Sequence, residues 1–221
     1  MGAVNRFLSC DWGTSRFRLR LVERTSLRIL AQHATDDGIQ AIAAAHPAGE
    51  ARGTALARVL EQGIAALHAD RQPEIPVVIS GMASSTLGWR SLPYAQLPAR
   101  ISGQTLVFED FAHAGRPVRL VSGLQAARDV IRGEETQLVG LFASPARESL
   151  AADCLVVLPG THSKHVRLRG GQIVDFTTHL TGELYSSLCD HSTLRPPPDS
   201  VFDEGAFREG IAASRGLALS A

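Results

Sequence analysis

Two stretches of the chain follow the same plan, and this internal echo limits the folds that are open to it. Each stretch has a short apolar run, a turn with Gly-Thr and hydroxyl groups, and a second run ending in Arg-Leu-Arg, over residues 6–20 and 152–169. The turns begin at Gly13 and Gly160, a spacing too long for stacked repeats but suited to two domains of similar plan. Coincidence in an Arg-rich, Leu-rich chain is the alternative, and the echo alone does not decide between them.

Hydrophobic patterning along the rest of the chain predicts a mixed α/β fold. Apolar runs and polar–apolar alternation predict strands at residues 6–10, 16–23, 27–32, 76–80, 105–109, 118–121, 152–158, 165–169 and 172–176. Apolar positions at helical spacing predict helices at 49–70 and 134–142, and Thr181 is a candidate N-cap of another helix. A further helix start is expected within residues 205–219.

Composition narrows the function classes. The 221 residues are 44% hydrophobic and 20% charged, as in a soluble globular protein, and the formal net charge is zero. A neutral chain has no overall field to attract a polyanion, so we expect no nucleic-acid and no membrane partner. No apolar run reaches the length of a transmembrane helix, and the first residues do not resemble a signal peptide. Three scattered cysteines, Cys10, Cys154 and Cys189, favour a reducing, cytoplasmic location over a disulfide framework or a zinc site.

The basic residues are almost all arginine. Lys and Arg together number 22, and Lys164 is the only lysine. A coding bias toward Arg tends to remove any lysine that Arg can replace, so Lys164 is a candidate for a site that needs a compact point charge. Chance survival on the surface is the alternative, and composition does not separate the two.

The two turns carry groups that suit phosphate binding. A glycine-containing turn exposes backbone N–H groups that can point at phosphate oxygens, and Thr and Ser hydroxyls add donors. Asp11 precedes the first turn and can hold Mg²⁺ through water, while Lys164 can neutralise a transferring phosphoryl group. Two such turns facing each other across a cleft would hold a triphosphate from both sides. For Asp11, Gly13 and Thr14 the alternative is an ordinary Asp-containing turn.

Five short segments, taken together, resemble a known family. Residues 11–15 are similar to the first phosphate motif of the actin, hexokinase and Hsp70 superfamily. Four further segments resemble the 2-dehydro-3-deoxygalactonokinase family in particular, and they occur in the family's order. They are Ser80-Gly81-Met82 with Gly88-Trp89, Arg132 to Gln137, Leu158 to Lys164, and Thr181 to Leu184 with His191-Ser192.

This resemblance implies two ribonuclease-H-like domains of the actin-like ATPase fold, with a cleft between them. The first would span residues 1–130 and hold the first phosphate hairpin and a substrate loop. The second would span residues 131–221, hold the second phosphate hairpin, and be incomplete because the family continues with an adenosine-binding part. The expected activity is transfer of the γ-phosphate of ATP to the 6-hydroxyl of 2-dehydro-3-deoxy-D-galactonate in galactonate catabolism, with Mg²⁺. We also expect this chain alone to be unstable or inactive.

The resemblance also implies roles for individual residues. Asp11 would organise Mg²⁺, and Glu134 would be the base that accepts the proton of the sugar hydroxyl, with Glu135 as the second candidate. A solvated helix N-terminus, where acidic residues are favourable, is the alternative for both glutamates. The phosphate-binding residues would be Gly13, Thr14, Ser15, Gly160, Thr161 and Lys164.

A substrate site is expected at the loop after the strand at 76–80, because ligands bind beyond the carboxyl ends of such strands. The candidates are Ser80, Gly81, Met82, Ser84, Trp89, Arg90 and Glu183. Arg90 can pair with the substrate carboxylate, although surface exposure is its alternative, and packing is the alternative for Trp89. Partners would be ATP and a sugar acid, with a homo-oligomer possible. A sugar-acid-binding relative without catalysis, or a phosphohydrolase on the same fold, remains open.

Overall fold

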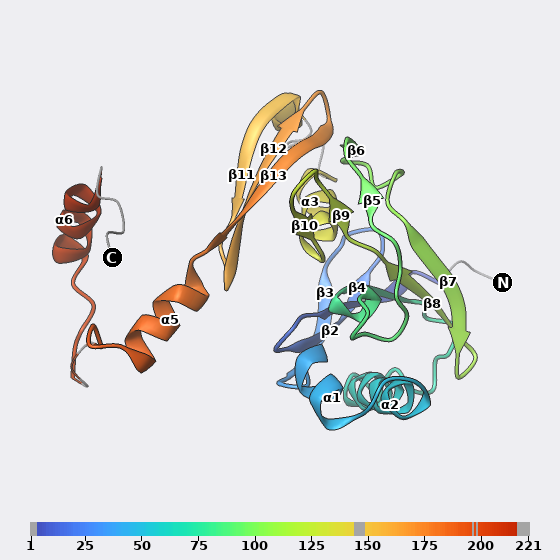
Figure 1. Ribbon diagram of the computed structural model, residues 1–221. Helices are drawn as coiled ribbons and strands as arrows, with labels where there is room; N and C mark the ends of the chain where they lie inside the picture. The colour runs from blue at the N-terminus through green and yellow to red at the C-terminus, as the bar shows by residue number, and fades with distance from the viewer. Residues whose placement is uncertain (1–3, 144–148, 196, 198, 216–221) are drawn as a thin grey trace.

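The computed structural model describes residues 4–143, 149–195, 197 and 199–215. These residues form a six-stranded, a four-stranded and a small three-stranded sheet, joined by helices and turns (Figure 1). The mixed α/β class predicted from the sequence is confirmed.

The first sheet has the strand order β3-β2-β1-β4-β8-β7. Its strands are β1 (Arg6–Trp12), β2 (Phe17–Glu23), β3 (Ile29–Thr35), β4 (Val77–Gly81), β7 (Phe108–His113) and β8 (Arg116–Val121). Strands β1, β2 and β3 form an antiparallel meander, while β1, β4 and β8 run parallel. The carboxyl ends of β1 and β4 therefore meet at one edge, where the first Gly-Thr turn and the expected substrate loop follow them.

Helices α1 (Ile39–Ala45) and α2 (Glu50–Ala66) cover one face of this sheet (Figure 1). The buried positions of β1 alternate along the strand at Leu8, Cys10 and Trp12, as one packed face requires. Trp12 meets Phe17 edge to face with ring centroids 4.8 Å apart. A methyl group at Gly63 of α2 would lie 2.7 Å from Phe17, so the helix packs closely on the sheet.

The second sheet has the order β11-β12-β13-β6 and is antiparallel throughout. Its strands are β11 (Asp153–Leu158), β12 (His162–Arg169), β13 (Gln172–Leu180) and β6 (Ala99–Arg100), and the short helix η2 (Ser149–Ala152) precedes β11. Val166, Leu168 and Phe176 form a second core with Leu138 of α3 (Glu134–Phe142).

A small three-stranded sheet combines one strand that precedes β7 and β8 in the chain with two that follow them. It has the order β10-β9-β5, formed by β10 (Val130–Ile131), β9 (Leu124–Gln125) and β5 (Ala95–Gln96). The domain boundary expected after residue 130 falls inside β10, and β6, from the range expected for the first domain, pairs with β13 at Ala99↔Ile173 and Arg100↔Gln172. A strand from the range expected for the first domain thus forms one edge of the second sheet.

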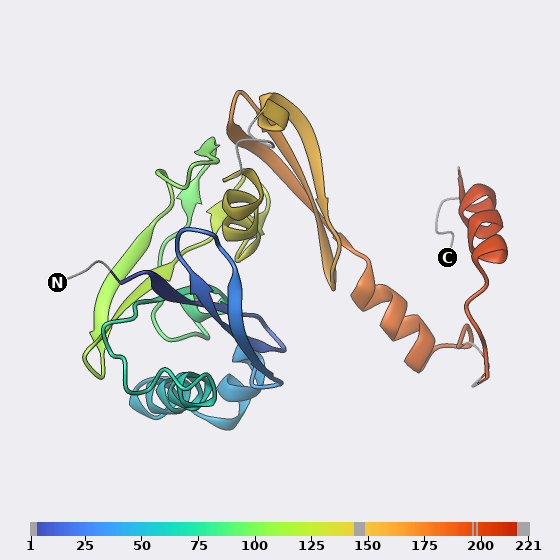
Figure 2. The same ribbon diagram turned by 180° about the vertical axis from the view of Figure 1, so that it is seen from behind.

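Helices α5 (Gly182–His191) and α6 (Glu204–Ser214) extend away from both cores, as Figures 1 and 2 show from opposite sides. Neither helix has a buried residue, and large apolar side chains such as Tyr185, Phe202 and Phe207 are exposed. Within the described residues, no helix is both long and apolar enough to cross a membrane.

The internal echo is a real repeat of structure. Strands β1, β2, β3 and helix α1 follow each other as β11, β12, β13 and α5 do, and each meander is antiparallel. Helix α1 was not predicted from the sequence, because only Ile39 and Ile42 of its seven residues are buried and the apolar pattern is short. Thr181 does occupy the N-cap position of α5, but its hydroxyl makes no capping bond.

Candidate active site

A cleft of about 530 Å³ lies where the two Gly-Thr turns approach each other. Its walls come from both turns, from the loop after β4 and from the start of α3. Nine residues predicted to form a site line it together: Asp11, Gly13, Thr14, Gly81, Met82, Glu134, Gly160, Thr161 and Lys164. Gly133 of the segment 132–137 lies among them. The volume is in the range of small-molecule sites.

The first turn is held by the start of helix α1. The carbonyl of Gly13 accepts from Ile39 N at 3.1 Å, and that of Thr14 accepts from Gln40 N at 3.0 Å. A Cβ at Gly38 would lie 2.3 Å from Thr14 O, so only glycine permits this close approach. The turn is fixed from behind by its carbonyls, and Thr14 faces the cleft.

The second turn is held in the same way by α5. The carbonyl of Gly160 accepts from Gly182 N at 3.2 Å, and that of Thr161 accepts from Glu183 N at 3.0 Å. The Thr181 hydroxyl also donates to Gly160 O at 3.1 Å. The echo therefore extends to equivalent hydrogen bonds behind each turn.

Asp11 is the next-to-last residue of β1, and it lines the cleft. Arg18, directly opposite on β2, donates to Asp11 Oδ2 at 3.0 Å. The described residues contain no cluster of three metal-ligating side chains. Mg²⁺ commonly uses one or two carboxylates together with water and substrate phosphates, so the donor set around Asp11 suits Mg²⁺ delivered with a nucleotide.

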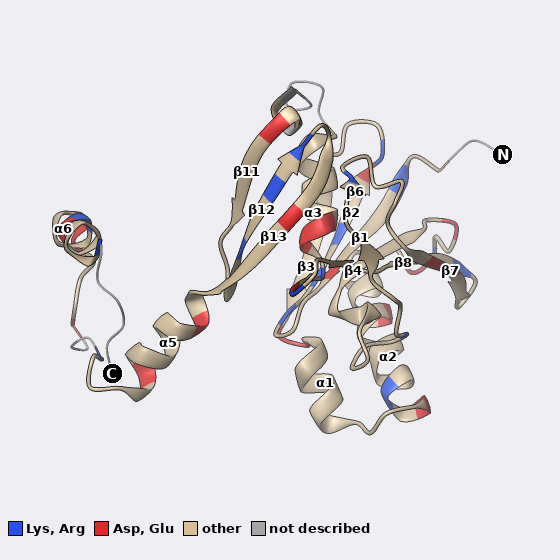
Figure 3. Cartoon of the chain, turned by 45° about the horizontal axis from the view of Figure 1, so that its top comes forward, with Lys and Arg blue, Asp and Glu red and all other residues tan. Residues whose placement is uncertain are grey.

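Lys164 reaches the cleft from β12, although its side chain is buried. Its exposed fraction is 7%, and Nζ lies 3.7 Å from Glu134 Oε1. The other carboxylate oxygen of Glu134 accepts from Arg132 N at 2.9 Å. In Figure 3, α3 carries acidic residues in red and β12 carries basic residues in blue. The only lysine is thus an interior group with an acidic partner, and the surface alternative does not hold.

Glu135 is the second residue of α3, and it does not line the cleft. It is fully buried, and Oε2 accepts from Gly133 N at 2.7 Å while Oε1 accepts from Thr136 Oγ1 at 3.1 Å. Burial raises the pKa of Glu135 to about 7, the charge of Glu134 acts in the same direction, and the hydrogen bonds oppose the rise. This carboxyl supports the turn that carries Glu134.

The loop after β4 is built on close backbone contacts. Gly81 has φ +91°, and a Cβ there would lie 2.6 Å from Trp12 O. Gly133 has φ +108°, and its Cβ would lie 3.3 Å from the Cα of Gly81, so the loop and the α3 start touch through two glycines. Gly81 and Met82 line the cleft, the latter in the short helix η1 (Met82–Ser84).

Two predicted serines stand behind the cleft wall. Ser80 Oγ donates to Cys10 O at 3.4 Å. Ser84 is fully buried, donates to Gly81 O at 3.3 Å and accepts from Arg132 Nη1 at 2.6 Å. Both hydroxyls are engaged with the protein, which makes them supports of the loop. Ser15 follows the first turn and is not part of the cleft lining.

Three other predicted substrate residues lie outside the cleft lining. Trp89 packs edge-on against Phe111, with centroids 5.6 Å apart. Arg90 pairs with Glu109, and its guanidinium carbon lies 3.9 Å from the centroid of Phe111. Glu183 pairs with His162 and borders a separate hollow along α5.

The cleft residues that the site prediction missed include Arg18, Tyr94 and Arg132. The β1–β2 hairpin places Arg18 opposite Asp11, so the cross-strand register contained that signal. Arg132 belongs to the segment 132–137 but was given no role. Tyr94 lies between strands in a stretch without a recognisable pattern.

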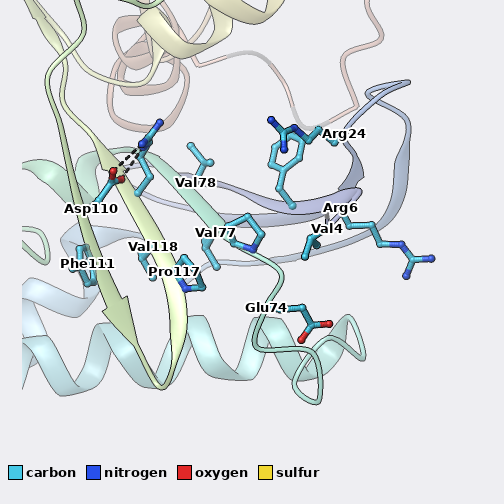
Figure 4. Close-up of a pocket in the computed structure, with 13 residues that line it drawn as sticks. Val4, Arg6, Arg24, Glu74, Val77, Val78, Asp110, Phe111, Pro117 and Val118 are labelled. Atoms are coloured by element: carbon cyan, nitrogen blue, oxygen red, sulfur yellow. Dashed lines mark hydrogen bonds and ion pairs between the residues drawn. The ribbon is translucent and has the colours of Figure 1, made fainter. Parts of the chain in front are cut away.

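A larger hollow of about 770 Å³ lies elsewhere on the first sheet (Figure 4). Its lining is mainly apolar, with Val4, Val77, Val78, Pro117 and Val118 among its residues. The Asp110–Arg119 ion pair, at 2.7 Å, lies at this hollow, and the bond to Arg119 holds the pKa of Asp110 below its usual value. It contains neither Gly-Thr turn, so the polar cleft is the better candidate for phosphate chemistry.

Comparisons with known proteins show the family to which the chain belongs. The family profile of 2-keto-3-deoxy-galactonokinase matches residues 11–220. The protein named "Probable 2-dehydro-3-deoxygalactonokinase DgoK1" of Rhizobium meliloti (strain 1021) is 33% identical over 220 residues, covering 96% of this chain and 65% of that protein. The 2-dehydro-3-deoxygalactonokinase of Escherichia coli (strain K12) is 33% identical over 219 residues, covering 96% and 66%.

A solved structure is similar as well. The crystal structure of a Sinorhizobium meliloti protein, provisionally named a 2-dehydro-3-deoxygalactonokinase, superposes with a TM-score of 0.76 at 31% identity, covering 95% of this chain and 66% of that one. The chain thus spans about two thirds of the length of the relatives it matches. On the family match and these identities, the chain belongs to the 2-keto-3-deoxy-galactonokinase family.

Proposed function

We propose that these residues form the phosphate-transfer cleft of an ATP-dependent kinase that phosphorylates the 6-hydroxyl of 2-dehydro-3-deoxy-D-galactonate in galactonate catabolism. The substrate class follows the names of the relatives. The observation that carries the proposal is the meeting of two similarly held Gly-Thr turns at one cleft with the Lys164–Glu134 pair. Because the chain spans part of its relatives, the proposal concerns the protein to which these residues contribute.

The cleft provides what phosphoryl transfer needs from a protein, which is mainly positioning and charge neutralisation. The Gly13-Thr14 and Gly160-Thr161 turns would bind phosphate oxygens from two sides. Lys164 would stabilise charge on the transferring group, and Glu134, 3.7 Å away, would accept the proton of the sugar hydroxyl. One compact ammonium between a carboxylate and a phosphate suits Lys better than Arg.

Asp11 would hold Mg²⁺, which would neutralise phosphate charge when it arrives with ATP. Arg18 already neutralises Asp11 in part through the 3.0 Å bond. The carboxylate would therefore bind the free metal weakly and the metal–nucleotide complex better, since phosphates supply the remaining ligands.

The repeated strand–turn–strand–strand–helix plan supports two ribonuclease-H-like domains around this cleft, over residues 1–130 and 131–221. The pairing of β6 with β13 would then be a strand exchanged across the domain boundary. A homo-oligomer and a cytoplasmic location stay predictions.

The test is a coupled ADP-release assay with ATP, Mg²⁺ and 2-dehydro-3-deoxygalactonate, run on the 221 residues alone and on the chain extended by a family-like C-terminal segment, each beside Lys164→Ala and Glu183→Gln. We expect turnover from the extended chain. Release that requires the sugar acid, and that is lost in Lys164→Ala but kept in Glu183→Gln, would support the kinase. Phosphate release without any acceptor would favour a phosphohydrolase. Calorimetric binding of the sugar acid without turnover would favour a non-catalytic relative.

A further inference from the structure

We propose that Arg132, resting on the ring of Tyr94, binds the carboxylate of the sugar-acid substrate. This inference rests on the proposed function, because it names the group that recognises the acid end of that substrate. It replaces Arg90, the residue that the sequence suggested for the role.

The charges that line the cleft leave one cation without an acidic partner. Arg18 pairs with Asp11, and Lys164 pairs with Glu134. Among the described residues, no carboxylate forms an ion pair with Arg132. A positive charge at the wall of a cleft, left unbalanced by the protein, is complementary to an anionic ligand.

Arg132 is held in place by groups other than carboxylates. Its Nη1 donates to the carbonyl and to the hydroxyl of Ser84, both at 2.6 Å. Its guanidinium carbon lies 4.2 Å from the centroid of the Tyr94 ring, a cation–π distance. Both Arg132 and Tyr94 line the cleft. The guanidinium is therefore pre-oriented, which lowers the entropy lost when a ligand binds.

The donors that remain on Arg132 suit a carboxylate. A guanidinium carries five N–H groups in a planar fork, and within the described residues the guanidinium of Arg132 donates hydrogen bonds only through Nη1. The other nitrogens are available for two parallel bonds to a carboxylate, the geometry at which Arg is most specific.

Arg132 also lies close in the chain to Glu134, the residue proposed to meet the hydroxyl end of the substrate. Its backbone N–H donates to Glu134 Oε2 at 2.9 Å, so the proposed carboxylate group and the proposed base belong to one short turn. In a linear six-carbon sugar acid, the carboxylate and the 6-hydroxyl lie at opposite ends. The cleft of about 530 Å³ can hold both ends of such a ligand.

Arg90 provides a matched comparison elsewhere on the surface. Its guanidinium also lies over an aromatic ring, 3.9 Å from the centroid of Phe111, but it pairs with Glu109 and does not line the cleft. Both arginines stack on an aromatic ring, but within the described residues only the charge of Arg90 is balanced by a carboxylate.

The test measures binding by calorimetry, without nucleotide, using the 221-residue chain. The ligands are 2-dehydro-3-deoxygalactonate and its neutral C1 amide, and ATP–Mg²⁺ binding is measured separately. We expect Arg132→Gln to weaken binding of the acid by about 10- to 100-fold, as for a lost charged hydrogen bond. The amide and ATP–Mg²⁺ should change by less than about threefold, and Arg132→Lys should bind the acid with intermediate affinity.

Two controls separate recognition from structural support. Ser84→Ala removes one contact behind Arg132 but keeps its guanidinium, and Arg90→Gln removes the stacked arginine outside the cleft. Both should keep the preference for the acid over the amide. Thermal unfolding of each variant identifies any that does not fold, and in that case Arg132→Lys decides.

Three results would contradict the role of Arg132. Equal weakening of acid and amide, selective loss of ATP–Mg²⁺ binding, or unchanged acid binding in Arg132→Gln would overturn it. Unmodified chain that binds neither the acid nor the amide would instead contradict the proposed function, so the two failures are distinguishable.

Discussion

The ammonium of Lys164 lies 3.7 Å from the carboxylate of Glu134, and this contact joins β12 of the second sheet to the start of α3. Both side chains are largely buried, and both line the cleft between the Gly-Thr turns. A charge in such a position is expensive unless it is paired, so each residue stabilises the other. The pair connects the phosphate-binding and acceptor-binding sides of the proposed reaction.

Replacement of Lys164 by Ala should lower kcat by about 10²-fold or more, the loss typical of removing one group that stabilises transition-state charge. Lys164→Arg should not restore the rate, because a planar fork cannot replace a compact ammonium in this buried position. Steady-state kinetics of the two variants test this. Full activity in Lys164→Arg would show that any cation is sufficient.

Glu134→Gln should lower kcat by about 10²- to 10⁴-fold with a smaller change in KM, since general-base contributions act on the chemical step. Its neighbour provides the control, because Glu135 does not line the cleft. Glu135→Gln should therefore keep most of the turnover. The opposite ranking of the two variants would assign the base to Glu135.

Glu135 should make the stability of the chain depend on pH. Its pKa in the folded chain is about 7, above the usual 4.5, so the folded state keeps this proton to higher pH than the unfolded state. The free energy of unfolding should then fall as pH rises from about 4.5 to 7 and level off above 7, by up to about 3 kcal/mol.

Urea unfolding at several pH values, compared between the unmodified chain and Glu135→Gln, isolates this contribution. The difference between their unfolding free energies should change over that pH window. A constant difference would mean that Glu135 has the same pKa in the folded and unfolded states.

Asp11 and Asp110 form a matched pair for testing the metal. Each accepts from an arginine directly opposite on the next strand, Arg18 and Arg119 respectively, but only Asp11 lines the cleft. Asp11→Asn should raise the Mg²⁺ concentration needed for half-maximal ADP release by at least about tenfold, because one metal ligand loses its charge. Asp110→Asn should leave the Mg²⁺ titration unchanged, and equal effects in both variants would count against a metal role for Asp11.

Gly81→Ala should destabilise the chain by about 2 kcal/mol or more, since its φ of +91° and a 2.6 Å contact with Trp12 O exclude a Cβ. Gly140 of α3 is the control, because an added Cβ would meet nothing within 4 Å there. Gly140→Ala should stabilise by about 0.5–1 kcal/mol, as expected within a helix. Thermal unfolding of both variants measures the contrast, and a neutral Gly81→Ala would show that the loop can rearrange.

Much of the fold could be predicted from local pattern. The apolar runs located β1, β4 and β11, and the helical spacing located α2 and α3 within a few residues. The two-residue strands β5, β6, β9 and β10 could not be predicted, because partners distant in the sequence define them. The paired turns were predicted because glycine and hydroxyl residues have intrinsic turn and phosphate preferences.

The site was predictable where backbone groups act and less so where long side chains reach across. Asp11, Gly13, Gly160 and Lys164 meet at one cleft as expected. Arg90 and Arg132 look alike in the sequence, and only tertiary contacts distinguish them, since one finds Glu109 and the other finds Ser84. The burial that raises the pKa of Glu135 likewise depends on the packing of α3.

The touching glycines at positions 81 and 133 have a mechanical consequence. With no side chain between the end of β4 and the start of α3, the two backbones pack directly against each other. The loop cannot advance toward the helix without displacing it, and the displaced segment carries both Arg132 and Glu134. A ligand that shifts the loop would thereby reposition the group that grips its acid end and the group that meets its hydroxyl end in a single movement.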